Sequence, residues 1–195
     1  MNGADAGAPD GASRRPGDYP SELERTWLAP DGTPVKIRAL RPDDLQRELE
    51  FARALSRQSL YLRLHYSPRE VTVRDAERLL ELDYHDTLAV GALVAGDHDD
   101  RIVGVSRYAR IDASDRAECA IVVADEWQGQ GLGTELMRSL ADAAKARGIV
   151  TLEGTSLAEN RRILAWARNF GIGARTESAD GGMARVILEL DSLPG

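Results

Sequence analysis

The spacing of hydrophobic and polar residues changes along this chain, and each change predicts a different kind of element. Three early segments place hydrophobic residues three or four positions apart, as amphipathic helices do. They are residues 41–55, 56–66 and 71–83. Three later segments are apolar runs rich in β-branched residues, namely residues 86–95, 101–111 and 116–124. Short polar turns separate these runs, so they predict an antiparallel meander of strands.

The C-terminal third alternates between the two patterns. A helix is predicted where Leu132, Leu136, Leu140 and Ala144 form one apolar stripe. It is followed by a strand, a helix and a strand at residues 149–157, 158–170 and 183–190. With two short strands in residues 25–40, this order predicts an α/β (α+β) domain. Its central sheet should be mixed and mostly antiparallel, with helices on both faces.

Composition indicates how the chain is divided into a tail and a domain, and where in the cell the protein is found. Residues 1–22 lack an apolar period and are rich in Gly, Ala, Pro and Asp. We expect a disordered tail there and a single domain over residues 23–195. The longest apolar run, residues 88–95, is too short to span a membrane, and no apolar segment follows the N-terminus. These features predict a cytoplasmic protein, and the preference for arginine over lysine indicates a bacterial genome rich in G and C.

Charge, cysteine content and histidine spacing argue against nucleic-acid binding, an intramolecular disulfide and a metal site. A formal net charge of −7 at pH 7 argues against binding to nucleic acid. The single cysteine, Cys119, has no partner for an intramolecular disulfide. The three histidines lie in different segments without the spacing of metal ligands, so we expect no metal site.

Alternate glycines mark residues 128–134, Gln-Gly-Gln-Gly-Leu-Gly-Thr, between a predicted strand and a predicted helix. The first N–H groups of a helix are unpaired, and the helix dipole makes that end attractive to anions. Glycines there let several N–H groups converge and let a phosphate approach without meeting a Cβ. We therefore predict a cradle for a pyrophosphate, with a simple glycine-rich connector as the alternative.

Two common nucleotide-binding motifs do not fit this stretch. A Rossmann fingerprint starting at Gly129 would need its third glycine where the sequence has Thr134. The predicted antiparallel meander also argues against a doubly wound sheet. A Walker A loop requires a Lys-Ser or Lys-Thr pair after the glycines, and the sequence has none there.

The chain instead resembles the family of GCN5-related N-acetyltransferases (GNAT). Their cofactor motif, Gln/Arg-x-x-Gly-x-Gly/Ala at a strand-to-helix junction, is met by Gln128, Gly131 and Gly133. Within the family the chain looks most like the catalytic domain of bacterial Pat-type protein lysine acetyltransferases, over roughly residues 34–190. The stretches that carry this likeness are IRALRPDD, SLYLRLHYSP, AECAIVVADEWQGQGLG and LAENRRILAWARNFG.

The resemblance implies acetyl-CoA as cosubstrate, bound where two neighbouring parallel strands splay apart. Backbone groups near Val122 and Val123 would hold the pantetheine arm and stabilise the oxyanion. Asn160 would lie near the thiol end, unless it is a plain helix N-terminal residue. Many family members have a tyrosine general acid seven positions later, where this chain has Ala167. The pyrophosphate would bind the backbone of Gln128, Gly129, Gln130, Gly131, Leu132, Gly133 and Thr134.

Glu118 lies inside an otherwise apolar strand, on the same predicted face as Ala120 and Val122. A carboxylate in such a place is costly to desolvate unless it is paired or works at a site. A buried carboxylate has a raised pKa, which suits it to act as a general base. The resemblance assigns that role to Glu118. The alternative is a solvent-facing residue paired with Arg107 or Arg116.

These features together predict an acetyl-CoA-dependent N-acetyltransferase that transfers the acetyl group directly to an amine. The Pat-type resemblance implies a lysine on a protein, such as an AMP-forming acyl-CoA synthetase. Acetylation of a small amine is one alternative, and an acyl-CoA-sensing module without catalysis is another. Tyr61, Arg63, His65 and Tyr66 are candidates for the acceptor side, with core packing as their alternative.

Overall fold

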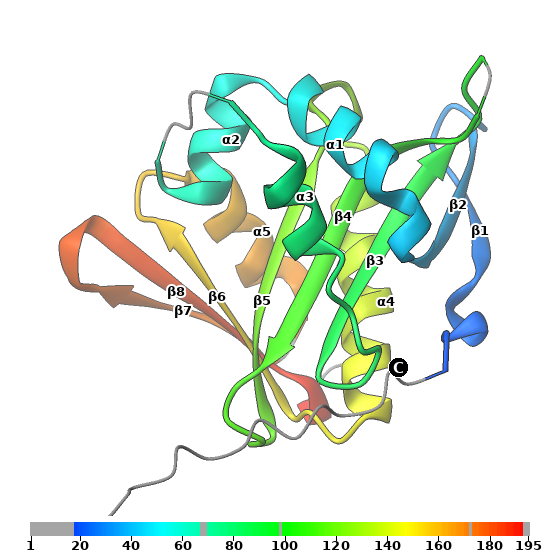
Figure 1. The fold of residues 1–195 in the computed structure, drawn as a ribbon. Helices are drawn as coiled ribbons and strands as arrows, with labels where there is room; N and C mark the ends of the chain where they lie inside the picture. Colours follow the sequence, from blue (N-terminus) through cyan, green and yellow to red (C-terminus); the bar gives the residue numbers. More distant parts are fainter. Residues whose placement is uncertain (1–17, 67–69, 98, 172, 193–195) are drawn as a thin grey trace, which may run out of the picture.

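The computed structural model describes residues 18–66, 70–97, 99–171 and 173–192, in which eight strands form one sheet (Figure 1). The order of strands across the sheet is β1-β2-β3-β4-β5-β6-β8-β7. The strands are β1 (Arg25–Leu28), β2 (Pro34–Ala39), β3 (Thr87–Val94), β4 (Arg101–Arg110), β5 (Arg116–Val123), β6 (Thr151–Leu157), β7 (Ala174–Ala179) and β8 (Met183–Glu189). The α-helices are α1 (Leu45–Ala54), α2 (Arg57–Leu64), α3 (Val73–Leu79), α4 (Leu132–Ala146) and α5 (Arg161–Phe170).

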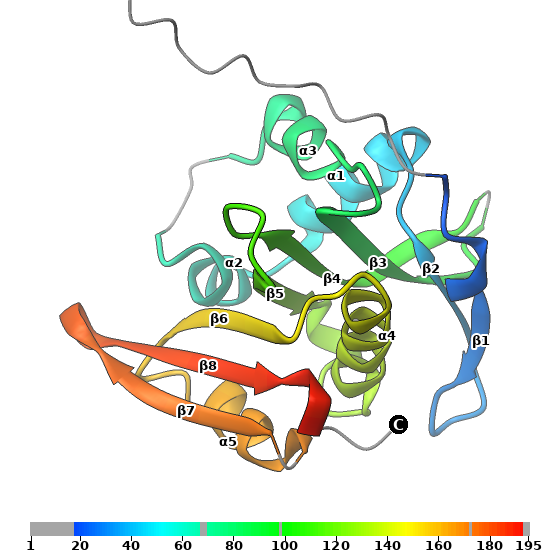
Figure 2. The same ribbon diagram turned by 90° about the horizontal axis from the view of Figure 1, so that it is seen from below.

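Helices cover both faces of this sheet. Figure 2 shows α1, α2 and α3 over one face, and α4 and α5 over the other. Every pair of neighbouring strands is antiparallel except β5 and β6, which are parallel. The structure therefore confirms the predicted meander and the mixed, mostly antiparallel sheet with helices on both faces.

The main core lies between α4 and the centre of the sheet. Leu132, Leu136 and Leu140 are fully buried there, as their helical spacing predicts. A Cβ at Gly104 of β4 would lie 2.9 Å from a methyl group of Leu136, so a larger residue there would require the Leu136 side chain to shift. The Ser106 hydroxyl donates to the Leu136 carbonyl across the same contact, at 3.0 Å. This packing fixes the N-terminus of α4 against β5.

Two parts of the fold differ from the expectation. Strand β7 was not predicted, because this edge strand is mostly exposed and lacks an apolar alternation. Residues 1–17 of the expected tail lie outside the described residues, whereas Tyr19 lies in the domain. The Tyr19 hydroxyl donates to Glu24 at 2.8 Å, and the Arg41 guanidinium lies 4.1 Å from its ring centroid. The packed domain therefore begins before the expected boundary at residue 23.

The parallel strands β5 and β6 are paired over only part of their length. Their register covers Arg116 to Glu118 on β5 and Thr151 to Glu153 on β6. Beyond these pairs the two strands diverge, as Figure 1 shows, although each continues for four or more residues. The expected splay is therefore present, and it begins directly after Glu118.

Candidate functional site

A cavity of about 440 Å³ lies where β5 and β6 diverge. Its walls come from α2, β5, the loop that leads into α4, β6, β8 and the N-terminal half of α5. Most of the residues predicted to bind acetyl-CoA line it, namely Val122, Val123, Gln128, Gly129, Gly131, Gly133, Thr134 and Asn160. Glu118, Gln130 and Leu132 do not. The loop that carries the sequence motif therefore lines this cavity.

The side chains of two predicted residues are turned away from the cavity. Leu132 is fully buried in the core under α4. The Gln130 amide nitrogen donates to the Glu126 carbonyl at 2.8 Å. Both residues contribute only backbone groups to the loop, which is the role predicted for them.

The edge of β5 that faces the splay has backbone groups without a strand partner. The Ala124 N–H donates to Val103 on β4 at 2.9 Å, so alternate residues, including Val122, direct their backbone toward β4. The intervening residues, Cys119, Ile121 and Val123, face the splay. A Cβ at Gly154 of β6 would lie 3.3 Å from the Cys119 carbonyl oxygen, which agrees with this direction. Val122 thus lines the cavity, but its backbone is directed away from it.

The loop before α4 exposes a row of free backbone donors. Gly129 and Gly131 have φ angles of +81° and +93°, which only glycine adopts without strain. The N–H groups of residues 129–133 donate to no acceptor in the described part of the chain. Gly131 is the N-cap residue of α4, so the helix dipole adds to these donors. This geometry matches the predicted pyrophosphate cradle.

Arg162 of α5 adds a positive charge that the sequence reasoning missed. Its guanidinium donates to the Gln128 side-chain carbonyl at 2.6 Å and lies 3.3 Å from where a Gly129 Cβ would be. The Gln128 amide nitrogen donates in turn to the Val123 carbonyl and the Ser59 hydroxyl, at 2.9 and 3.2 Å. Gln128 therefore ties α5, β5 and α2 together at the cradle. The one sequence feature that could have indicated Arg162 is its position, two residues after the predicted site residue Asn160.

Glu118 is exposed, which contradicts the burial we expected of it. It lies opposite Ala109 on β4 and Glu153 on β6, at the start of the splay. Neither predicted ion-pair partner binds it, because Arg107 pairs with Glu48 and Arg116 pairs with Glu153. The structure therefore agrees with the solvent-facing part of the alternative, but neither arginine pairs with Glu118 in the described residues.

Three charged side chains interact beside the cavity, namely Glu48 of α1, Arg63 of α2 and Arg107 of β4. The Arg107 guanidinium donates to Glu48 of α1 at 2.8 Å and to the Leu79 carbonyl at 2.8 Å. Burial raises the pKa of Glu48, against the charge of Arg107, and burial lowers the pKa of Arg107. Burial, followed by the charge of Arg107, lowers the pKa of Arg63 to about 10. Of the four acceptor-side candidates, only Arg63 lines the cavity, and Tyr66 is 60% exposed.

The first half of α5 also lines the cavity, whose wall includes α2 as well. The Asn160 side-chain oxygen accepts from the Ile163 N–H at 3.2 Å, so Asn160 caps the helix and also lines the cavity. The Trp166 indole donates to the Thr134 hydroxyl at 3.0 Å, which joins α5 to the first turn of α4.

The described ranges hold neither a metal-binding cluster nor a membrane-spanning helix. They contain no group of three or more His, Cys, Asp or Glu side chains placed to hold a metal ion. No helix in them combines the length and the apolar character that crossing a membrane requires.

Cys119 lines the cavity and also packs against the core, and burial raises the pKa of its thiol to about 12. At pH 8 only about one such thiol in 10⁴ is ionised. We expect iodoacetamide to alkylate Cys119 about a thousandfold more slowly than free cysteine at pH 8. The rate should rise about tenfold per pH unit up to the pKa. Fast alkylation at pH 8, measured by mass spectrometry, together with inactivity of Cys119→Ala, would instead indicate a nucleophilic cysteine.

A bulky side chain at Gly131 should abolish binding of acetyl-CoA. A Cβ there would make only an ordinary contact, 3.8 Å from Trp27, but Gly131 lines the cavity, so a larger side chain would take up space beside the cradle. We expect Gly131→Leu to weaken the affinity by a factor of about 100 or more in calorimetry, because the loss of several charge-assisted hydrogen bonds has this size.

Gly148, just beyond the other end of α4, provides the matched control. Its φ of +74° gives a similar strain, and an added Cβ has no neighbour within 4 Å. Gly148→Leu should lower the melting temperature comparably and leave the affinity for acetyl-CoA unchanged. Equal affinities of the two variants would place the cradle elsewhere.

Comparison with known proteins decides the family. The profile of the Acetyltransferase (GNAT) family matches residues 53–172, more than half of the chain. The protein is a GNAT acetyltransferase. Members of this family use acetyl-CoA, which agrees with the cavity and its cradle.

Individual relatives of this GNAT acetyltransferase are bacterial. An acetyltransferase of Pseudomonas aeruginosa is 37% identical over 131 residues, which cover 67% of this chain and 70% of the relative. Acetyltransferase Pat of Mycolicibacterium smegmatis is 32% identical over 128 residues, covering 64% of this chain but only 37% of that protein. The crystal structure of the GNAT domain of S. lividans PAT superposes with a TM-score of 0.80 at 25% identity, covering 88% of this chain and 99% of that domain.

Proposed function

We propose that this GNAT acetyltransferase transfers the acetyl group of acetyl-CoA to a lysine of a protein, in the cytoplasm. The observation that carries the proposal is the likeness to the GNAT domain of S. lividans PAT, which extends over nearly the whole described chain. The partial match to Acetyltransferase Pat of M. smegmatis supports the same subgroup. An AMP-forming acyl-CoA synthetase is the acceptor we propose.

The cradle and the edge of β5 would hold acetyl-CoA. The N–H groups of residues 129–133 would donate to the pyrophosphate, and Arg162 would supply a positive charge beside it. The Val123 carbonyl already accepts from Gln128, so the Val123 N–H and the backbone groups of Cys119 and Ile121 would be offered to the pantetheine arm. Asn160 and Trp166 would enclose the arm from α5.

Glu118 would act as the general base, directly or through a water. A lysine ammonium with a pKa of about 10.4 must lose a proton before its nitrogen can attack the thioester carbon. The N–H groups of Cys119 or Ile121 would stabilise the resulting oxyanion. The carbon–sulfur bond then breaks, and coenzyme A leaves as a thiolate. Because a thiol pKa is only about 8.5, this leaving group does not require a general acid in place of Ala167.

The acceptor is tested by offering a purified acyl-CoA synthetase and, separately, a panel of small amines. We expect one lysine of the synthetase to gain one acetyl group in mass spectrometry when acetyl-CoA and the enzyme are both present. Omission of either one is the control. Acetylation of small amines alone would exclude the protein acceptor and keep the family. Binding of acetyl-CoA without any transfer would favour a sensor.

A further inference from the structure

Arg63 is a cation at the cavity wall, and its guanidinium has no hydrogen-bond or ion-pair partner among the described residues. It lines the cavity from α2, and no hydrogen bond or ion pair joins it to another side chain in the described ranges. The charged groups that act on its pKa are Arg107, which lowers it, and Glu48, which raises it. With a pKa of about 10, the guanidinium carries its charge at neutral pH.

The neighbouring charges do not neutralise Arg63. Glu48 is 3% exposed and binds Arg107 through one oxygen, whereas its other oxygen has no hydrogen-bond partner. A single carboxylate can compensate at most one of the two guanidinium groups. The Cys119 thiol is neutral, because burial raises its pKa to about 12. At least one positive charge therefore remains at the wall of the cavity, in a partly desolvated place where its field is strong.

Arg63 lines the cavity one helical turn beyond Ser59, the residue of α2 that contacts the cradle. Ser59, one turn earlier on α2, lies beside the cradle, where its hydroxyl accepts from Gln128 and donates to Asp125. Arg63, one turn later, lines the same cavity as Cys119, which is the first residue of β5 beyond its pairing with β6. An arm that runs along β5 from the cradle would therefore bring the acyl carbon close to Arg63.

We propose that Arg63 binds a carboxylate of the substrate at the acyl end of the cavity. This carboxylate belongs either to the acyl group, as in succinyl-CoA, or to the acceptor beside its amine. The inference rests on the proposed function, since it requires an acyl-CoA in the splay. The exposed Glu118 at the same end repels such a carboxylate less than Arg63 attracts it, because solvent screens exposed charges.

The transfer remains the one described above, with another acyl group. The amine nitrogen forms a bond to the thioester carbon, the carbon–sulfur bond breaks, and one proton is released. The terminal carboxylate takes no part in these bond changes. It would only pair with the guanidinium, in a bidentate contact that arginine favours.

The first test measures the affinities for acetyl-CoA and succinyl-CoA by calorimetry. We expect the wild type to bind succinyl-CoA about tenfold or more tightly than acetyl-CoA. Arg63→Met should remove this preference, and Arg63→Lys should keep part of it. Arg57→Met, which removes an exposed charge from the same helix, should leave it unchanged. Melting temperatures would show whether each variant is folded.

The second test asks whether the carboxylate belongs to the acceptor. Peptides with a glutamate or a glutamine beside the lysine are compared by their KM values, with wild type and Arg63→Met. A preference for glutamate that is lost in Arg63→Met supports a carboxylate on the acceptor. Absence of any carboxylate preference in both tests would overturn the proposal. Failure to bind acetyl-CoA at all would overturn the proposed function instead.

Discussion

Glu118→Gln is expected to lower the turnover by a factor of about 10²–10⁴ and to leave the affinity for acetyl-CoA unchanged. Glutamine has nearly the same shape as glutamate but cannot accept a proton from the incoming ammonium. Glu118 lies outside the cavity wall, so the loss should appear in kcat rather than in binding. The measurement combines thiol release under saturating substrates with calorimetry of acetyl-CoA.

Glu153→Gln is the matched control for this variant. Glu153 is the register partner of Glu118 on β6, but Arg116 binds it. It should retain turnover within a few-fold of the wild type. If Glu118→Gln also retained its turnover, or if both variants lost it equally, Glu118 would not be the general base.

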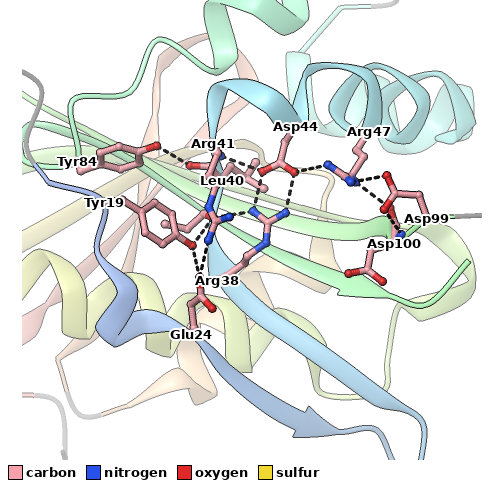
Figure 3. Close-up of polar contacts among 11 residues, drawn as sticks. Tyr19, Glu24, Arg38, Leu40, Arg41, Asp44, Arg47, Tyr84, Asp99 and Asp100 are labelled. Carbon is pink, nitrogen blue, oxygen red and sulfur yellow. Dashed lines mark hydrogen bonds and ion pairs between the residues drawn. The ribbon is translucent and has the colours of Figure 1, made fainter.

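Asp44→Asn should reduce the free energy of unfolding by about 3–5 kcal/mol, because it breaks a buried ion pair. Asp44 is fully buried and accepts two hydrogen bonds from Arg38, at 2.6 and 2.7 Å (Figure 3). The backbone N–H of Arg41 and the guanidinium of Arg47 donate to the same carboxylate, at 2.9 and 3.0 Å. The variant would leave the buried Arg38 charge uncompensated. The melting temperature should fall by about 6–20 °C.

The pH dependence of this effect has a definite sign. Burial alone would raise the pKa of Asp44, but the hydrogen bonds from Arg38 and Arg41 and the nearby positive charges lower it below the usual value. Its contribution to stability is therefore complete above the unfolded-state pKa of about 3.9 and is lost as the pH falls through the folded-state pKa. The difference between wild type and variant should shrink in that range.

Asp99→Asn provides the control within the same network. Asp99 binds Arg47 at the surface, and its side chain is 65% exposed. Such a pair contributes at most about 1 kcal/mol. Equal destabilisation by the two variants in urea denaturation would contradict the role of Asp44. The network matters for the site because α1 starts directly after Asp44 and places Glu48 beside Arg107 one turn later.

The parts of the fold that the sequence predicted are those set by local periodicity. The runs of β3, β4 and β5 are short, apolar and bounded by polar turns, and the stripe on α4 repeats with the helical period. Strand β7 has no such signal, because it is an exposed edge strand whose strand neighbour is β8. The place of Tyr19 also escaped prediction, since its contacts with Arg41 and Tyr84 depend on residues far away in the sequence.

The part of the candidate site that could be predicted is the part formed by consecutive residues of the sequence. The glycine loop positions its own donors through local backbone angles, so the spacing of Gly129, Gly131 and Gly133 was sufficient. Arg162 and Arg63 reach the cavity from helices on opposite faces of the sheet, and no local pattern distinguishes them from surface arginines. Alternation gave the correct face for Glu118 but not its exposure, which depends on the helices above it.

A crystal structure of the protein with acetyl-CoA tests the central claim most directly. The account predicts the pyrophosphate on the N–H groups of residues 129–133, with Arg162 beside it. The pantetheine arm should run along β5 from Val123 to Cys119, with the acetyl group near Arg63. An arm bound outside the divergence of β5 and β6, or a splay that stays closed to the cofactor at saturating concentration, would contradict the account.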